Sequence, residues 1–146
     1  MTRELEMERM RTRLGGSKRW VIKIGSALAT NDGLGLNLAR TQNWAEQIAE
    51  LGTMGYQIVI VASGSVAEGA SRLGWTERPR ILNKLQAAAA IGQIGLARTW
   101  AQVFERVDCK AAQILLTHDD LADRQRYLNA RTTLLTLIDL AVFPII

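Results

Sequence analysis

The most constraining feature of the sequence is a pair of short apolar runs, each followed at once by glycine and serine. The first run, Trp20–Ile24, leads into Gly25 and Ser26, and the second, Gln57–Ala62, leads into Ser63–Ser65. Apolar runs of this length that are bounded by turn residues are typical of strands. Because neither run alternates strictly between apolar and polar residues, both favour parallel strands that are covered on both faces.

The rest of the chain alternates between helical and strand-like patterns. Apolar residues at helical spacing predict helices over residues 38–51, from residue 66 onward, over 81–107 and over 127–140. Two more apolar runs predict strands at Ala112–Leu116 and at Ala141–Ile146, the latter interrupted by Pro144. Such alternation is typical of a doubly wound α/β sheet, in which ligands bind beyond the carboxyl ends of the strands. Because the chain stops on an apolar strand, we expect a truncated domain or one whose missing half comes from another chain.

Composition limits the classes of function. The chain has 146 residues, a formal net charge of +4 and 5% aromatic residues. Its basic residues are scattered except in residues 1–18, which we expect to be a flexible leader, so nucleic-acid binding is not expected. The single cysteine, Cys109, excludes a disulfide framework within the chain and a zinc site built from cysteines. No apolar run is long enough to span a membrane and no signal-peptide core is present, which favours a cytoplasmic protein with no membrane partner.

A lysine lies near the end of the first apolar run. Lys23 precedes Ile24, Gly25 and Ser26. An ammonium group in a buried strand is costly unless it meets an anion, and a glycine allows backbone N–H groups to come close to that anion. The order of strand, lysine, glycine and hydroxyl predicts a phosphate site. The alternative is a lysine on an edge strand whose ammonium group reaches water.

A second anion site is predicted where the second strand joins a helix, over Ser63–Gly69. The free N–H groups and the positive end of a helix dipole favour an anion at such a start. Gly64 and Gly69 have the glycine spacing of a Walker A loop, but the required Lys-Ser or Lys-Thr pair does not follow, so that motif is excluded. The alternative is a helix cap with a glycine for tight packing.

Two further polar clusters follow the third apolar run. Thr117–Asp120 has the spacing of a helix N-cap with an acid three residues later. Its His118 and acids are consecutive and point in different directions, so we expect no metal site there. Arg124 and Arg131 share one face of the next predicted helix and can hold a carboxylate or phosphate. They can equally pair with Asp120 and Asp123 in a surface network, which the spacing favours.

Taken together, these stretches resemble the amino-acid kinase family and, within it, the glutamate 5-kinases. The general resemblance lies in Val21–Ser26 and Val61–Gly69. The finer resemblance lies in Leu73–Trp75, Leu85–Gln93, Gln113–Asp120 and Asp123–Arg131. It covers residues 19–146, and the last two stretches are the most specific.

The resemblance implies a three-layer αβα sandwich with a mainly parallel sheet, of which residues 19–146 form the N-terminal part. It implies ATP-dependent phosphorylation of the γ-carboxylate of L-glutamate to glutamyl 5-phosphate, the first step of proline biosynthesis, with ATP and Mg²⁺ as cofactors. By this match Lys23 is the catalytic residue and binds the ATP phosphates together with Gly25, while Ser63 and Gly64 bind the substrate. No protein ligand for a metal is implied. The full-length enzyme is expected to form a homo-oligomer.

The chain departs from the family in two respects. Ala62, Ser65 and Glu68 replace smaller or differently polar residues, and Glu68 adds negative charge near an anion site unless it points to solvent. The family also continues past the fourth strand into segments with further glutamate and nucleotide contacts. We therefore expect the 146-residue chain alone to be inactive.

Two other functions are considered. The chain can be a non-catalytic module that binds an anion or a partner, since a long apolar terminal strand favours self-association. It can also be another amino-acid kinase, such as an acetylglutamate or carbamate kinase, although Asp123–Arg131 argues against this.

Overall fold

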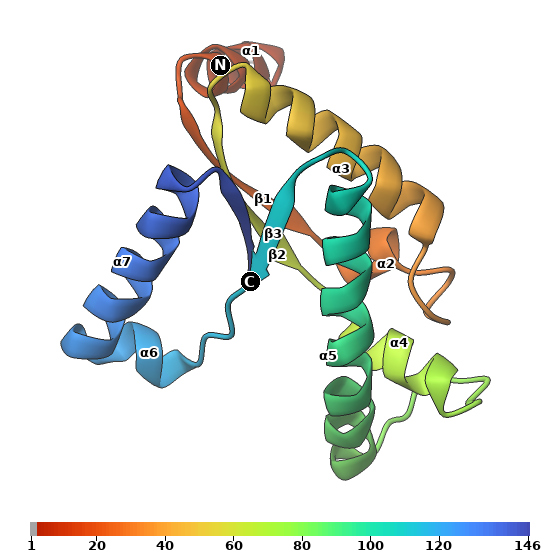
Figure 1. Ribbon diagram of the computed structural model, residues 1–146. Coiled ribbons are helices and arrows are strands. Elements are labelled where there is room, and N and C mark those ends of the chain that lie inside the picture. Colours follow the sequence, from red (N-terminus) through yellow and green to blue (C-terminus); the bar gives the residue numbers. More distant parts are fainter. Residues whose placement is uncertain (1–2) are drawn as a thin grey trace.

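A computed structural model describes residues 3–146. Its elements are α1 (Arg3–Gly15), β1 (Arg19–Ile24), α2 (Ser26–Ala29), α3 (Leu38–Thr53), β2 (Gln57–Ala62), α4 (Ser65–Arg72), α5 (Leu82–Glu105), β3 (Lys110–Gln113), α6 (His118–Ala122), α7 (Arg124–Asp139) and β4 (Val142–Ile145). Within these residues four strands form one sheet in the order β1-β2-β4-β3, and each neighbouring pair is parallel. Figure 1 shows α3 and α5 on one face of the sheet and α7 on the other. The predicted α/β sandwich with a parallel sheet is confirmed.

β1 and β2 run level with each other. Their register pairs Arg19 with Gln57 at the start and Ile24 with Ala62 at the end. One residue further on, the backbone N–H of Ser63 donates to the carbonyl of Ile24 at 3.1 Å. Because parallel strands that end level deliver their loops to one edge of the sheet, the segments after β1 and β2 begin side by side.

One face of the sheet, which we call the closed face, packs against α3 and α5. Ile60 of β2 and Phe104 of α5 have no exposed surface there. The ring of Phe104 stacks on Phe143 of β4 and on Trp100, with centroids 4.8 and 6.0 Å apart. Complete burial of one such side chain stabilises a fold by about 1.5–3 kcal/mol, so this face is a main source of stability.

The opposite face, which we call the open face, is covered in part by α7. This helix lies in the connection from β3 to β4 and packs beside β4, because a crossover covers the strands that it joins. At β1 the cover is missing: Val21 is 68% exposed, and Lys23 is exposed as well. The prediction that the first strand is covered on both faces is therefore wrong for the part of the chain that the structure describes.

β4 lies inside the sheet although it contains a proline. The prediction that Pro144 interrupts a strand over Ala141–Ile146 is wrong, because Pro144 lies within β4 and pairs in register with Ala112 of β3. The N–H of Ile146 donates to the carbonyl of Ile60 in β2, at 2.8 Å. Alternate residues of a strand face the same neighbour, so the N–H that Pro144 lacks would also face β2. The short register between β2 and β4, a single residue pair, is consistent with this loss.

β3 differs from its prediction in position. It spans Lys110–Gln113 rather than Ala112–Leu116, and Leu115 in the predicted run is 70% exposed. Its pairing partner β4 ends at Ile145, whose carbonyl accepts the N–H of Ile114 at 2.8 Å. The length of β3 is set by the strand beside it, which hydrophobicity alone does not reveal.

Helices α3, α4, α5 and α7 form in the regions where helical spacing predicted them. α7 begins at Arg124 rather than at residue 127. The cause is the cap: the Asp123 side chain accepts the backbone N–H of Arg126, which satisfies one of the free donors of the first turn.

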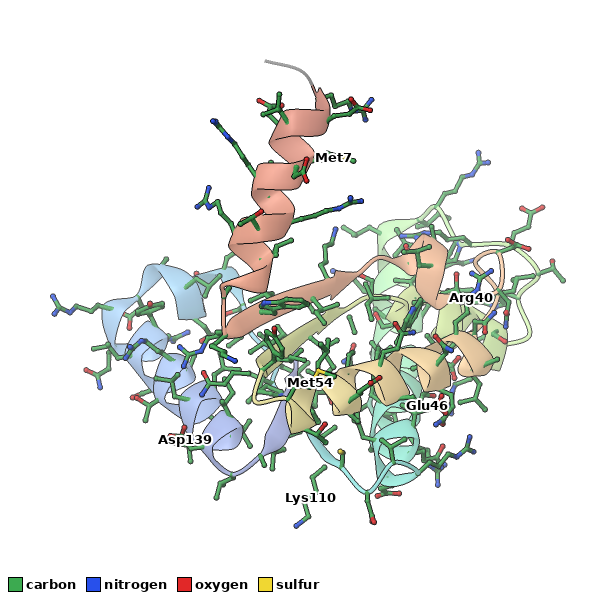
Figure 2. The ribbon with its side chains drawn as sticks, turned by 90° about the horizontal axis from the view of Figure 1, so that it is seen from above. Met7, Arg40, Glu46, Met54, Lys110 and Asp139 are labelled. Atoms are coloured by element: carbon green, nitrogen blue, oxygen red, sulfur yellow. The ribbon has the colours of Figure 1, made fainter. Side chains whose placement is uncertain are left out.

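The N-terminal segment contains a helix without buried residues. Figure 2 shows α1, with Met7, projecting away from the rest of the chain. The indole N–H of Trp20 donates to the carbonyl of Ser17 at 3.0 Å and so ties the end of the segment to β1. Flexibility of this leader stays a prediction. Neither α1 nor any other helix within residues 3–146 is long and apolar enough to cross a membrane.

Candidate active site

Lys23 lies on the open face near the carboxyl end of β1. Because side chains alternate along a strand, Lys23 and Ile24 point to opposite faces of the sheet, and the side chain of Lys23 is exposed. A lysine in contact with water needs no anion to offset burial, so that argument for a phosphate site does not hold. Its place at a strand end is the argument that remains. Gly25 follows as the N-cap of α2, and a Cβ added there would meet no atom within 4 Å, so open space adjoins the turn.

The end of β2 is shaped by a glycine. Gly64 has a φ of 127°, which favours glycine, and a Cβ on it would lie 2.9 Å from Cδ2 of Leu36. The same residue is the N-cap of α4, and no side chain caps this helix. The backbone donors of its first turn therefore remain available to an anion, and the helix dipole places positive charge there. Gly64 is thus favoured by the backbone path itself, whether or not a ligand binds.

The two strand ends share one short edge of the sheet. Lys23 pairs in register with Val61, which lies two residues before Ser63. The N–H of Ser63 is bonded to Ile24, and the N–H of Ala62 is bonded to the carbonyl of Ile146 at 2.8 Å. The structure thus gathers the predicted residues after β1 and β2 at the place where β4 also ends.

A segment that was not predicted as part of the site joins these ends. In Thr30–Asn37, the Thr30 hydroxyl donates to the carbonyl of Ser26 at 2.8 Å, and Thr30 forms an isolated bridge with Leu36. Leu36 in turn packs on Gly64. The turn motif Asn31–Gly33 in this segment indicates where the chain turns but not what the segment contacts.

Glu68 does not point to solvent. Its carboxylate accepts the N–H of Leu36 at 3.1 Å and pairs with the guanidinium of Arg72 at 2.8 Å, and its side chain is 14% exposed. The negative charge is thus offset by a cation on the same helix. The concern that Glu68 repels an anion at the start of α4 is reduced accordingly.

The polar cluster after β3 is a helix cap, as predicted. The hydroxyl of Thr117 accepts the N–H of Asp120 at 3.3 Å, and the Asp120 carboxylate accepts the N–H of Thr117 at 2.7 Å. The bonds from the backbone and the hydroxyl of Thr117, and then the charge of Arg126, hold the pKa of Asp120 below its ordinary value. His118, the first residue of α6, is exposed.

The arginines of α7 lie on the surface. Arg126 is 3.8 Å from the Asp120 carboxylate, while Arg124 and Arg131 are exposed. Within the described residues Asp120 thus pairs with Arg126, and not with Arg124 or Arg131 as predicted. Among the residues that the structure describes, no group of three or more His, Cys, Asp or Glu side chains is placed to hold a metal ion.

Cys109 lies at the other end of the sheet. It lines a cavity of about 550 Å³ together with Lys110 and Val142, which begin β3 and β4. Burial, and then the charge of Asp108, raise the pKa of the Cys109 thiol, which keeps it protonated and a weak nucleophile. Because ligands of parallel α/β sheets bind at the carboxyl ends of strands, we place the candidate site at the opposite edge.

Known proteins are similar to this chain over most of its length. The sequence profile of the amino acid kinase family matches residues 18–146. The chain is 58% identical over 143 residues to a glutamate 5-kinase of Hahella chejuensis, which covers 98% of this chain. It is 56% identical over 140 residues to a glutamate 5-kinase of Thioalkalivibrio sulfidiphilus, which covers 96% of it. In both cases the chain spans 37% of the relative's length.

A similar fold occurs in a solved structure of low sequence identity. The carbamate kinase from Giardia lamblia bound to AMP-PNP aligns with a TM-score of 0.53 and 17% identity, covering 88% of this chain and 55% of that protein. At this level of identity the likeness concerns the fold, and it agrees with the parallel sheet between helices.

Proposed function

We propose, from the premise that this chain belongs to the amino acid kinase family, that it is part of a glutamate 5-kinase. The reaction is transfer of the γ-phosphoryl group of ATP to the γ-carboxylate of L-glutamate. The observation that carries the proposal is the hydrogen bond from Ser63 to Ile24, which sets the turn after Lys23 beside the start of α4. Identity of 56–58% to two glutamate 5-kinases supports the choice of substrate.

The site has two arms, the end of β1 with its turn (Lys23–Ser26) and the start of α4 (Ser63–Ser65). Each arm has a distinct role in this proposal. Lys23 offsets the negative charge that develops on the transferred phosphoryl group, since such transfer depends chiefly on positioning and charge stabilisation. Gly25 gives the phosphates access to backbone N–H groups, because no atom fills the space beside it. Ser63 donates to a glutamate carboxylate, and the uncapped start of α4 at Gly64 favours the same negative group.

The described residues fit ATP better than they fit a metal. An exposed ammonium, open space at a glycine turn and free backbone donors suit a phosphate chain. ATP supplies the phosphoryl group that is transferred. Residues 3–146 offer no carboxylate cluster for Mg²⁺, so no step is assigned to that ion here, although Mg²⁺ is expected with the nucleotide.

The proposal extends to the setting of the reaction. Residues 19–146 are taken as the N-terminal part of the kinase domain and residues 1–18 as a leader. The chain spans 37% of the length of these relatives, and we expect the remaining contacts to glutamate and nucleotide to come from outside that part, so Met1–Ile146 alone is expected to be inactive. A cytoplasmic location, a homo-oligomeric full-length enzyme and the absence of nucleic-acid binding are further expectations.

The test is a chimera in which this chain replaces the matching 37% of the Hahella chejuensis relative. We expect glutamate-dependent release of ADP within about tenfold of the unaltered relative, and none from Met1–Ile146 alone. Acetylglutamate and carbamate, offered as substrates in parallel, should not replace glutamate.

The outcomes separate the alternatives. A folded chimera without activity on any of the three substrates would favour a non-catalytic module. Preference for acetylglutamate or carbamate would assign the chain to another kinase, and turnover by Met1–Ile146 alone would contradict the expectation of an incomplete site.

A further inference from the structure

The two arms of the site are connected through one side chain of the segment Thr30–Asn37. Leu36 packs against Gly64, since a Cβ at Gly64 would lie 2.9 Å from Cδ2 of Leu36. The backbone of Leu36 forms a bridge with Thr30, whose hydroxyl holds the carbonyl of Ser26. A displacement of Leu36 therefore moves the contacts of both the turn after β1 and the start of α4.

Glu68 holds Leu36 in this position. Its Oε2 accepts the N–H of Leu36 at 3.1 Å, while its Oε1 is bonded to Nε of Arg72 at 2.8 Å. The neighbouring N–H of Gly35 donates to the carbonyl of Ala67 at 3.2 Å. A carboxylate that accepts a backbone N–H forms a stronger bond than a neutral acceptor does, so Glu68 attaches the segment to α4 more strongly than the bond from Gly35 does.

α5 provides the space that this arrangement needs. A Cβ on Gly95 would lie 2.5 Å from Oε1 of Glu68 and 2.7 Å from Nη2 of Arg72. Gly95 is buried in a helix, and its φ is not one that requires glycine. Glycine at this position thus leaves room for the carboxylate and the guanidinium, which a larger residue would displace.

We propose that Glu68 is a positioning residue, which fixes the segment Thr30–Asn37 between the two arms and so sets Lys23 and Gly25 against Ser63 and Gly64. This positioning role rests on the proposed function, whereas the hydrogen bond from Leu36 to Glu68 does not. Glu68 touches neither phosphate nor glutamate; it acts through Leu36. The residue that the sequence marked as an unfavourable charge near an anion is thus an attachment point of the site.

The first experiment measures amide hydrogen exchange by NMR in the full 146-residue chain, with Glu68→Ala, Glu68→Gln and the control Glu50→Ala on the exposed face of α3. We expect the Leu36 amide to exchange at least about tenfold faster in Glu68→Ala, because it loses a charged acceptor. Glutamine keeps a neutral acceptor, so the exchange rate of the Leu36 amide in Glu68→Gln should lie between those of the unsubstituted chain and of Glu68→Ala. Glu50→Ala should leave the Leu36 amide unchanged.

The second experiment uses the chimera described above and compares kcat with KM. Loss of the relative placement of the arms should lower kcat about tenfold or more in Glu68→Ala, because small misplacements of reacting groups reduce turnover strongly. KM for glutamate should change by less than about threefold, since Ser63 itself is intact. Glu68→Gln should restore part of kcat, a rescue that a general loss of stability would not give.

These readouts distinguish two kinds of failure. An inactive parent chimera would overturn the proposed function, whereas the exchange data on Leu36 would still test the contact. Leu36 exchange in Glu68→Gln equal to that of the unsubstituted chain would overturn the positioning role, even if Glu68→Ala does not fold. A rise in KM for glutamate without a fall in kcat would reassign Glu68 to substrate binding.

Discussion

The two faces of the sheet differ in what they bury. On the closed face, Ile60 and Phe104 have no exposed surface, and three aromatic rings stack between α5 and β4. On the open face at β1, Val21 is 68% exposed and Lys23 is in contact with water. β1 contributes to both faces, because successive side chains point to opposite sides: Ile24 is buried and Lys23 is exposed.

Strand alternation thus places the residues that stabilise the fold and the residues proposed for the reaction on opposite faces of the sheet. The closed face is a source of the apolar burial that holds the strands in register. The open face carries a charged group that contributes little to that burial. Substitutions on the two faces should therefore differ in kind, affecting unfolding on one face and kinetics on the other.

The largest expected effect is on the closed face. Phe104→Ala should lower the free energy of unfolding by about 3–5 kcal/mol, because it leaves a cavity between Trp100 and Phe143. Val21→Ala on the open face should change it by no more than about 0.5 kcal/mol. Urea denaturation of both variants, followed by circular dichroism, measures the difference. Equal losses would remove the distinction between the faces.

The next effect is on the open face and concerns turnover. Lys23→Ala in the chimera should lower kcat by about 100-fold or more, as for loss of one group that stabilises transition-state charge. Its free energy of unfolding should stay within about 0.5 kcal/mol, because the side chain is exposed. Full activity with glutamate and ATP would show that the phosphate site lies elsewhere.

A smaller effect is expected at the edge where β2 ends. Ser63→Ala in the chimera should raise KM for glutamate by about five- to thirtyfold, corresponding to about 1–2 kcal/mol for a hydrogen bond to a charged group. Initial rates at varied glutamate and at varied ATP separate the two substrates. An unchanged glutamate dependence with a raised requirement for ATP would assign Ser63 to the nucleotide.

The smallest effect concerns the cap of α6. The pKa of Asp120 is lowered in the folded chain, so its stabilising contribution is present above its unfolded pKa of about 3.9 and is lost as pH falls through the folded value. The stability difference between the unsubstituted chain and Asp120→Ala should therefore shrink between pH 7 and pH 3. Unfolding measured at several pH values checks this. A difference that grows toward acid pH would contradict the cap.

Several local features could be predicted from the sequence. β1 and β2 form where the two apolar runs indicated, and the Thr117–Asp120 cap forms from four adjacent residues. Such features depend on neighbouring residues, whose chemistry is visible in the sequence itself. The position of β3 was missed because pairing with β4, and not the hydrophobicity of Leu115, decides where that strand ends.

Of the candidate site, the sequence indicated the residues but not their connection. Lys23, Gly25, Ser63 and Gly64 were predicted from their places at or just after the ends of apolar runs, and their roles from the family resemblance. The role of Leu36 between the arms was missed, because its contact with Gly64 joins segments that are distant in the chain. The direction of Glu68 was equally hidden, since the space for its carboxylate is provided by Gly95 on another helix.

The sequence by itself determined the approximate places of the longer helices and of β1 and β2, because periodicity and capping act over a few neighbouring residues. The tertiary structure decided the strand order, the cover of each face and the exposure of Lys23. These depend on which elements pack against each other. Pro144 illustrates the limit. Its missing N–H suggested an interrupted strand, but β4 is continuous. The side of β4 that lacks the N–H faces β2, with which β4 shares one residue pair, while the other side pairs along its whole length with β3.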